Sequence, residues 1–187
     1  MKLIGNRSLV GLKLSLAVAL VASTAAITSC STTAPIAATP SASATPINSI
    51  PGAQVFDGIA VSGSFGVAPV TQLSDTIDAS KFLGYDLILG SGATVTAKDK
   101  VSVEYLARSV KSKREFDSSW GRGKPFVFLP SRVNFSAFSR GVLGMKVGGR
   151  RVLVIPGAEA FGATPPAGSG LGVNESLVFV VDLLKIG

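Results

Sequence analysis

The sequence has no histidine and only one cysteine among its 187 residues. The lack of histidine excludes catalysis that depends on an imidazole base, such as Ser-His-Asp triads and Cys-His pairs, and it excludes the common zinc sites. A single cysteine excludes a disulfide within the chain. Any enzyme activity must therefore work without a histidine base, a thiol nucleophile in the folded domain or a conventional metal cluster. We expect no cofactor and no metal.

Acidic residues are missing from the N-terminal part of the chain, which exaggerates the basic character of the whole. The formal net charge is +7, but Lys2, Arg7 and Lys13 lie in the predicted targeting segment. Without these three, 15 basic and 11 acidic residues remain, a net charge of +4. This mild excess gives no reason to expect a nucleic-acid partner. The one basic run, residues 111–114, lies between two strand-like segments and is expected to be a solvated hairpin tip.

Residues 1–29 have the layout of a secretory signal peptide. Three positive charges precede an apolar stretch over residues 14–27, which is too short to span a membrane comfortably. The segment ends in ITSC, which resembles a bacterial lipobox, so we expect cleavage before Cys30 and lipidation of this cysteine. Acyl chains would then hold the protein outside the cytoplasmic membrane, because each buried methylene contributes about 0.8 kcal/mol. Ordinary signal cleavage nearby, with Cys30 as a spare thiol, is the alternative.

Three regions of different composition follow the signal peptide. Residues 30–52 are rich in Ala, Ser, Thr and Pro, cannot bury enough apolar surface to offset their ordering entropy, and are expected to form a disordered tether. Residues 53–84 mix apolar residues with glycine and are expected to be an extended lead-in, which either adds an edge strand or packs across the domain. Residues 85–187 carry short apolar runs and form the domain that can bury a core.

The pattern within this domain predicts mostly strands. Residues 101–108 alternate between apolar and polar side chains, as in a half-buried strand. Further strands are expected over residues 124–129, 150–155 and 177–184. The last of these is almost wholly apolar, which is typical of a central strand covered on both faces.

One segment has a helical period instead. Phe135, Phe138, Val142 and Met145 recur at helical spacing, Asn134 stands at the N-cap position, and two glycines limit the length. A single short helix among several strands predicts an α+β fold, in which a curled antiparallel β-sheet wraps around one short α-helix.

Seven short fragments of this domain carry a family resemblance through their order and spacing. They are residues 103–105 (VEY), 115–119 (EFDSS), 124–128 (KPFVF), 141–151 (GVLGMKVGGRR), 155–156 (IP), 161–162 (FG) and 177–179 (LVF). Together they resemble the FKBP family of peptidyl-prolyl cis/trans isomerases over residues 85–187. The resemblance implies an FKBP-like fold and an apolar pocket for a prolyl bond.

The resemblance assigns four residues to catalysis. Phe138 stands where the family commonly has tryptophan and would form the floor of the proline site. Tyr105 would form a wall, and Phe116 would line the rim. Asp117 would orient polar groups near the twisting carbonyl, although the residues around it also fit an aspartate that caps a turn.

Six more residues are implied in substrate binding. Phe135 would offer its backbone N–H to a substrate carbonyl, Arg122 would hold Asp117 in an ion pair, and Leu171 would touch the substrate from the loop before the last strand. The set is completed by Phe126, Phe161 and Phe179. Aromatic residues in strands often pack in a core, and this alternative stays open for Phe126 and Phe179.

Such a pocket fits the composition of the chain. Rotation about an X–Pro bond has a barrier of about 18–20 kcal/mol because it breaks amide resonance. The resonance form is charge-separated and favoured by water, so an apolar pocket favours the twisted amide without a nucleophile, metal or histidine. The resemblance implies an isomerase that acts on proline-containing segments, here of exported proteins, and that binds macrolide ligands, and we expect it to be a monomer. A non-catalytic chaperone or proline-segment binding module with the same fold is the alternative, and a purely structural surface lipoprotein is a third.

Three departures from the family pattern bear on efficiency and ligand choice. Phe138 offers less area than tryptophan. Phe161 lacks the hydroxyl of the usual tyrosine, which removes a hydrogen bond of about 0.5–1.5 kcal/mol to a bound ligand. Gly172 and Val173 stand in place of a pair of prolines.

Overall fold

The computed structural model describes residues 50–187. The predicted signal peptide, the predicted lipidation site Cys30 and the predicted tether up to residue 49 lie outside the described residues. Within residues 50–187, no helix combines the length and the apolar character needed to cross a membrane.

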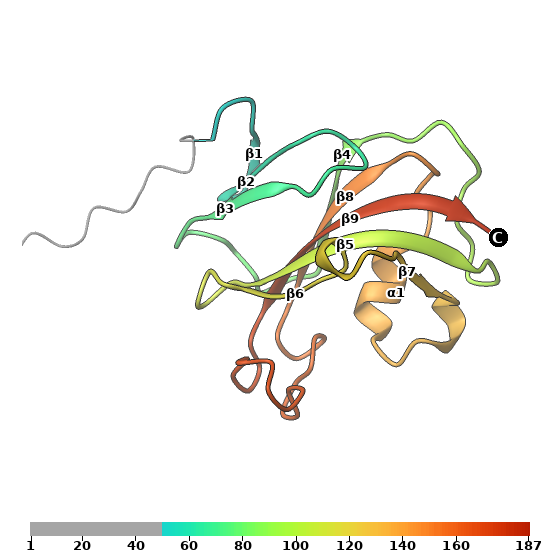
Figure 1. The fold of residues 1–187 in the computed structure, drawn as a ribbon. Helices are drawn as coiled ribbons and strands as arrows, with labels where there is room; N and C mark the ends of the chain where they lie inside the picture. Colours follow the sequence, from blue (N-terminus) through green and yellow to red (C-terminus); the bar gives the residue numbers. More distant parts are fainter. Residues whose placement is uncertain (1–49) are drawn as a thin grey trace, which may run out of the picture. The chain divides into compact units, whose positions relative to one another are not determined.

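Residues 50–187 form two antiparallel sheets and a short helix (Figure 1). The small sheet has the order β1-β2-β3, and the main sheet has the order β4-β8-β9-β5-β6, with β7 paired to β5. The strands are β1 (Gln54–Phe56), β2 (Ile59–Ser62), β3 (Val70–Leu73), β4 (Leu83–Ile88), β5 (Val101–Ser109), β6 (Glu115–Ser118), β7 (Phe126–Phe128), β8 (Arg150–Ile155) and β9 (Leu177–Ile186). The helical elements are η2 (Trp120–Arg122), η3 (Pro130–Arg132) and α1 (Ser136–Val142).

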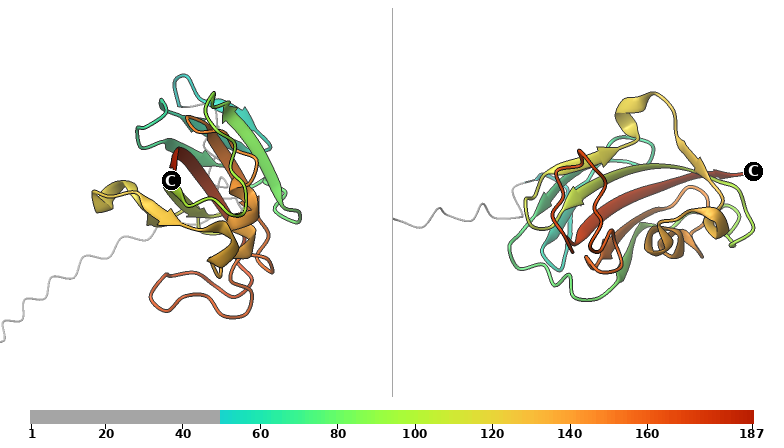
Figure 2. Two further views of the ribbon diagram at one scale, coloured as in Figure 1. Left: turned by 90° about the vertical axis from the view of Figure 1, so that its right-hand side faces the viewer. Right: turned by 90° about the horizontal axis from the view of Figure 1, so that it is seen from below.

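The strand β9 lies in the middle of the main sheet, between β8 and β5. Its side chains alternate between two buried clusters, with Leu177, Phe179 and Val181 in the cluster that includes α1. Val178 and Val180 point the other way, into the cluster that includes the small sheet. Both faces are therefore buried, as predicted from the apolar run, and Figures 1 and 2 show α1 and the small sheet on opposite sides of the main sheet. The predicted curled antiparallel sheet with one short α-helix is confirmed.

The helix α1 differs from the prediction at both ends. Its N-cap is Phe135, which makes no side-chain capping hydrogen bond, so the prediction of Asn134 as the N-cap is wrong. The helix ends at Val142, and Gly144 then takes a left-handed conformation with φ of 76°. Met145 is therefore outside the helix, but this reversal returns its side chain to the core, where it is 2% exposed. The helical spacing of apolar residues therefore extends to Met145, three residues beyond the end of α1, because the turn at Gly144 and not the helix brings Met145 into the core.

The predicted lead-in is a three-stranded meander. Asp57 and Gly58 form a two-residue turn between β1 and β2, both with positive φ, which is the turn chemistry of a tight hairpin. Of the two arrangements left open by the sequence, the structure has packing across the domain, because Ile59 and Val61 are buried against the main sheet. The lead-in also contributes its last two residues, Leu83 and Gly84, to β4, which forms one edge of the main sheet.

A buried ion pair within the main sheet binds the loop between β2 and β3 of the small sheet. Arg150 and Asp182 face each other on β8 and β9, and both are 1% exposed. The guanidinium donates to the Asp182 carboxylate with N···O distances of 2.5 and 2.8 Å, and to the carbonyls of Gly63 and Val67, each at 2.7 Å. Asp182 also accepts a hydrogen bond from the amide of Gly66 at 2.8 Å. The loop between β2 and β3 is therefore bound to charges inside the main sheet.

The basic run at residues 111–114 lies at the tip of the β5–β6 hairpin, as predicted. The prediction that this tip is simply solvated is wrong for Lys113. Its ammonium donates to the carbonyl of Ser74 at 2.6 Å and lies 3.3 Å from the carboxylate of Asp75. The segment after β3 reaches the hairpin tip, a contact between parts of the chain that are about forty positions apart.

Candidate active site

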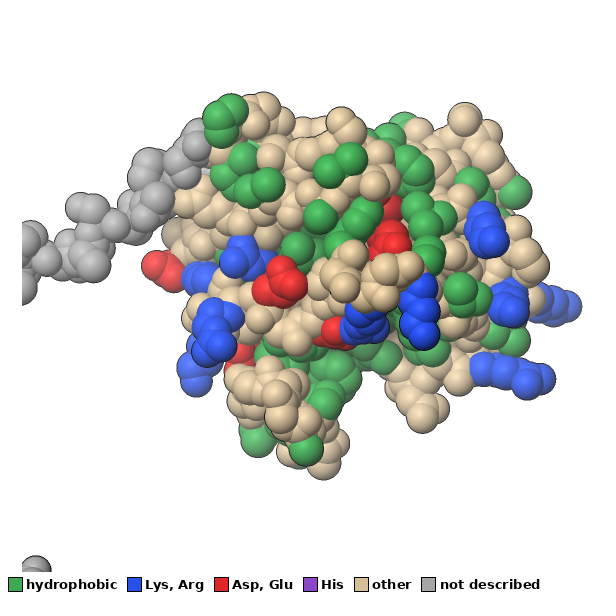
Figure 3. Space-filling model, in the orientation of Figure 1, with side chains coloured by type: hydrophobic (Ala, Val, Ile, Leu, Met, Phe, Trp, Pro, Cys, Tyr) green, Lys and Arg blue, Asp and Glu red, His purple; other side chains and the backbone are tan. Residues whose placement is uncertain are grey.

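An aromatic pocket opens between the main sheet, α1 and the loop before β9. It has a volume of about 120 Å³. Its lining consists of Tyr105, Phe116, Asp117, Phe126, Val133, Phe135, Phe138, Phe161 and Phe179. Eight of these nine are among the ten residues that the sequence predicted for the site. In Figure 3, hydrophobic side chains reach the surface between β6 and the loop of residues 157–175, near the bottom of the view.

The floor of the pocket is a packed group of rings centred on Phe138. Its side chain projects from α1, is 3% exposed, and has Phe179 of β9 and Tyr105 of β5 at ring-centre distances of 5.2 and 5.9 Å. Phe126 of β7 lies edge-on to Tyr105 at 5.8 Å. Phe126 is also stacked at 5.0 Å on Phe128, which belongs to the core. Phe126 and Phe179 therefore act both as core and as pocket wall, so the two alternatives for them are not exclusive.

Three aromatic side chains surround the mouth. Phe161 stacks on Phe135 with ring centres 4.9 Å apart and lies edge-on to Phe116 at 6.4 Å. Phe135 lies just before α1, where helix amides have no acceptor within the helix. This position agrees with the predicted role of its N–H as a donor to substrate, which stays a prediction.

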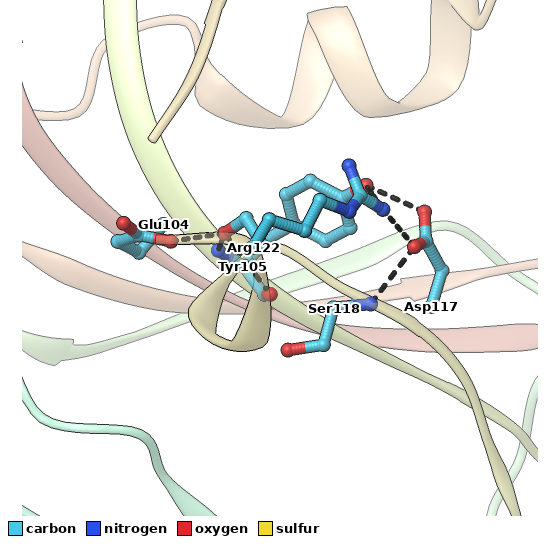
Figure 4. A network of polar contacts seen from close by, with 6 residues as sticks. Glu104, Tyr105, Asp117, Ser118 and Arg122 are labelled. Atoms are coloured by element: carbon cyan, nitrogen blue, oxygen red, sulfur yellow. Dashed lines mark hydrogen bonds and ion pairs between the residues drawn. The ribbon is translucent and has the colours of Figure 1, made fainter. Parts of the chain in front are cut away.

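A polar cluster borders the apolar pocket on one side (Figure 4). The Tyr105 hydroxyl donates to Asp117 Oδ2 at 2.5 Å, and the Ser118 amide donates to Asp117 Oδ1 at 2.9 Å. The Arg122 guanidinium forms an ion pair with Asp117 and a hydrogen bond of 3.0 Å to the Tyr105 hydroxyl. Asp117 thus both caps the local turn and orients the cluster, and the predicted Arg122–Asp117 ion pair is present.

Burial and the hydrogen bond to Asp117 raise the pKa of Tyr105 to about 12. The phenol therefore stays protonated at neutral pH and remains a donor. The guanidinium of Arg122 has a raised pKa because it donates to Asp117 and Tyr105. At the edge of the pocket, the structure thus provides a fixed arrangement of a carboxylate, a phenol and a guanidinium.

A second set of hydrogen bonds holds the segment that carries Asp117. The hydroxyl of Ser119 accepts from the Tyr105 amide at 2.8 Å and donates to Glu104. The Ser119 amide donates to the Tyr105 carbonyl at 2.9 Å. These bonds tie η2 and the end of β6 back to β5, and so place Asp117 and Arg122 beside Tyr105.

Two residues lie differently from the prediction. Leu171 does not line the pocket; it is half-buried and lines a neighbouring small cleft together with Phe116. Its predicted contact with substrate therefore requires a ligand that extends beyond the pocket. Val133 lines the pocket but was missed, because a single valine between Arg132 and Asn134 has no periodic signal, and only the turn at η3 directs it inward.

Comparison with known proteins relates this fold and pocket to one family. The family model described as FKBP-type peptidyl-prolyl cis-trans isomerase matches residues 92–184. An FK506-binding protein of Streptomyces anulatus is 40% identical over 102 residues, which are 54% of this chain and 82% of that protein. A probable FK506-binding protein of Corynebacterium glutamicum is 41% identical over 101 residues, with the same two coverages of 54% and 82%.

Two solved structures agree with this relationship. A peptidyl-prolyl cis-trans isomerase from Pseudomonas syringae has a TM-score of 0.50 and 27% identity, over 57% of this chain and 75% of that one. FkpA from Escherichia coli has a TM-score of 0.50 and 32% identity, over 58% of this chain and 49% of that one. With its fold, its aromatic pocket and these relatives, the chain belongs to the FKBP-type peptidyl-prolyl cis-trans isomerases and is an enzyme of that class.

Proposed function

We propose that this isomerase assists the folding of exported proteins by binding a proline in the aromatic pocket and stabilising the twisted amide. The observation that carries the proposal is the pairing of nearly all-aromatic walls with the polar cluster of Tyr105, Asp117 and Arg122 at one edge. Proline-containing segments are the expected substrates, and the non-catalytic chaperone or binding module is the competing function.

The environment of the pocket suits the reaction. The planar prolyl amide is polarised by resonance, and this polarisation is lost as the bond twists. Transfer from water to aromatic walls therefore costs the planar ground state more than the twisted state, and catalysis depends on such differential binding. The polar cluster presents dipoles that are already oriented, so little reorganisation is required when the carbonyl turns. Each tenfold acceleration requires only about 1.36 kcal/mol of this differential stabilisation.

The catalytic role of the pocket can be tested with two single substitutions. We expect Asp117→Ala to lower kcat/KM about tenfold, because it leaves Tyr105 and Arg122 without their shared acceptor. Phe126→Ala should lower kcat/KM by a similar factor of about ten, through loss of a wall. The measurement is cis/trans exchange of a short Xaa-Pro peptide, followed by NMR exchange spectroscopy.

Val127→Ala is the matched control for Phe126→Ala. Val127 lies in the same strand, but its side chain is 48% exposed and does not line the pocket. Its replacement should leave kcat/KM unchanged. Exchange with the wild-type protein that equals exchange in buffer would contradict the proposed catalysis and favour the binding module.

The same pocket is the proposed site for macrolides. Two bacterial relatives are named for binding FK506, and the walls here are of the apolar kind that such ligands require. Phe161 offers no hydroxyl at the mouth, so we expect weaker binding than in a relative with tyrosine at this position.

For the location of the protein, we propose a lipid anchor on Cys30 at the outer side of a bacterial cytoplasmic membrane. The support is the sequence alone, since Cys30 is the single cysteine and follows a short apolar stretch. Cells that express the protein should incorporate a labelled fatty acid into it, and Cys30→Ala should abolish the label. An unlabelled wild-type protein, or a label that survives the substitution, would overturn the anchor.

A further inference from the structure

The loop between Phe161 and β9 borders the mouth of the pocket but has no helix or strand of its own. Gly168, Gly170 and Asn174 take positive φ in it, so the chain turns repeatedly between residues 163 and 175. Its internal hydrogen bonds are local, such as those from the Ser169 amide to the Pro166 carbonyl and from the Leu171 amide to the Ser169 hydroxyl. Its position on the domain therefore depends on the bonds that tie it to other elements.

Glu175 makes one of these bonds, and the same carboxylate also closes a turn within the loop. One oxygen, Oε1, accepts from the hydroxyl of Ser109 at the end of β5. The other, Oε2, accepts from the amide of Gly172 at 2.6 Å. A Cβ on residue 172 would lie only 3.0 Å from this oxygen, so glycine at this position leaves room for the carboxylate. The carboxylate thus joins the loop to a strand 66 positions away.

The same contact extends to the β5–β6 hairpin. Ser109 is 1% exposed, and its hydroxyl also accepts from the amide of Ser112 at 2.8 Å. The bond from Ser109 and the nearby charge of Lys111 contribute to a lowered pKa of Glu175, with the Ser109 bond the largest cause. Glu175 is therefore ionised at neutral pH and can accept from both donors. Together with the hydrogen bond from the Val110 amide to the Ser176 carbonyl at 2.9 Å, this charged group links the loop to the hairpin.

These two loops enclose Phe116 and Leu171. A cleft of about 60 Å³ lies between them, and Phe116 and Leu171 are its apolar side chains. The rest of its lining is Ser109, Ser112, Arg114, Glu115, Ser169 and Gly170. Phe116 also lines the aromatic pocket, so the cleft begins where the pocket ends. A peptide whose proline fills the pocket would place the side chain of a neighbouring residue beside Phe116 and Leu171.

We propose that Glu175 is a positioning residue, which holds the two loops at the distance that admits an apolar side chain adjoining the proline. The proposal rests on the aromatic pocket as the proline site. Glu175 does not touch the proline itself; it acts through Leu171 and Phe116. Its loss should therefore affect the choice among peptides more than the isomerisation of a bound one.

The test compares Glu175→Ala with wild type on Xaa-Pro-Zaa peptides in which either neighbour of the proline is alanine or leucine. We expect KM to rise about tenfold for the leucine peptides, with kcat and the alanine peptides nearly unchanged. Glu175→Gln should recover part of the preference, because its carbonyl can still accept from one donor. Glu159→Ala is the control, since Glu159 is another half-exposed carboxylate near the loop, paired with Arg140 on the surface.

Amide hydrogen exchange at Ser112 and Gly172 gives a readout that does not depend on catalysis. Both amides should exchange faster in Glu175→Ala and at the wild-type rate in Glu159→Ala. Unchanged exchange, or a KM that rises equally for all peptides, would overturn the proposal. A wild-type protein without isomerase activity would refute the function of the pocket, while faster exchange at both amides would still support the role of Glu175 in loop position.

Discussion

Replacing Arg150 by alanine is expected to lower the free energy of unfolding by about 3–5 kcal/mol. Asp182 would remain buried at 1% exposure, with the amide of Gly66 as its one remaining partner among the contacts described above. The carbonyls of Gly63 and Val67 would also lose their donor. An unpaired charge in the interior is costly because it has given up its hydration without compensation.

Urea denaturation of Arg150→Ala and wild type measures this effect directly. Arg140→Ala is the matched control, because Arg140 forms an ion pair with Glu159 in which both side chains are at least 40% exposed. An exposed pair contributes at most about 1 kcal/mol. An equal loss of stability in the two variants would contradict the prediction, because it would show that the buried ion pair contributes no more to the free energy of unfolding than the exposed one.

The contacts of this ion pair extend the folded domain toward the N-terminus, beyond the residues that match the family. The family match covers residues 92–184, yet Arg150 holds the loop between β2 and β3, which lies well before residue 92. The small sheet also covers Val152 and Val180 on the face of the main sheet opposite α1. Residues 54–73 are therefore part of the packed unit. The hydrogen bonds from Arg150 fix the orientation of the small sheet on the main sheet, which apolar packing alone would not do.

Gly157→Ala is expected to have the second large effect. An added Cβ would lie 1.8 Å from the backbone oxygen of Asn174 and 2.2 Å from its carbonyl carbon. Backbone atoms cannot move aside as a flexible side chain can, so the two segments must separate, at a cost of about 1–3 kcal/mol or more. Gly162 is bonded to both segments, through its amide to the Gly157 carbonyl and through its carbonyl to the Asn174 amide. Its neighbour Phe161 should therefore shift at the pocket mouth.

The expected result is a lower thermal midpoint together with a lower kcat/KM for Xaa-Pro peptides. Gly121→Ala provides the comparison, because Gly121 has ordinary φ and no heavy atom within 4 Å of an added Cβ. That substitution should be neutral or slightly stabilising. If Gly157→Ala keeps both the midpoint and the activity of wild type, the close approach of the two segments does not determine the position of Phe161.

Local sequence was sufficient for the features that depend on neighbouring residues. The resemblance to the FKBP family placed eight of the nine pocket residues. Strand and helix periods predicted the elements that carry them, because these periods decide which side chains share a face. The prediction of a half-buried strand at β5 is wrong, since Ser102 and Leu106 on its second face are buried as well. The errors at α1 have a similar origin. Spacing alone could not tell that Phe135, rather than Asn134, is the N-cap, or that Met145 reaches the core through the turn at Gly144.

The sequence by itself therefore determined the α+β class, the aromatic character of the site and the absence of histidine chemistry. Tertiary structure alone decided that the lead-in packs across the main sheet, that Arg150 is bonded to Gly63, and that Glu175 joins two loops beside the pocket. The last two contacts link residues 87 and 66 positions apart. No local period encodes such pairs, since they form only when the folded sheets bring distant charges and donors together and remove them from water.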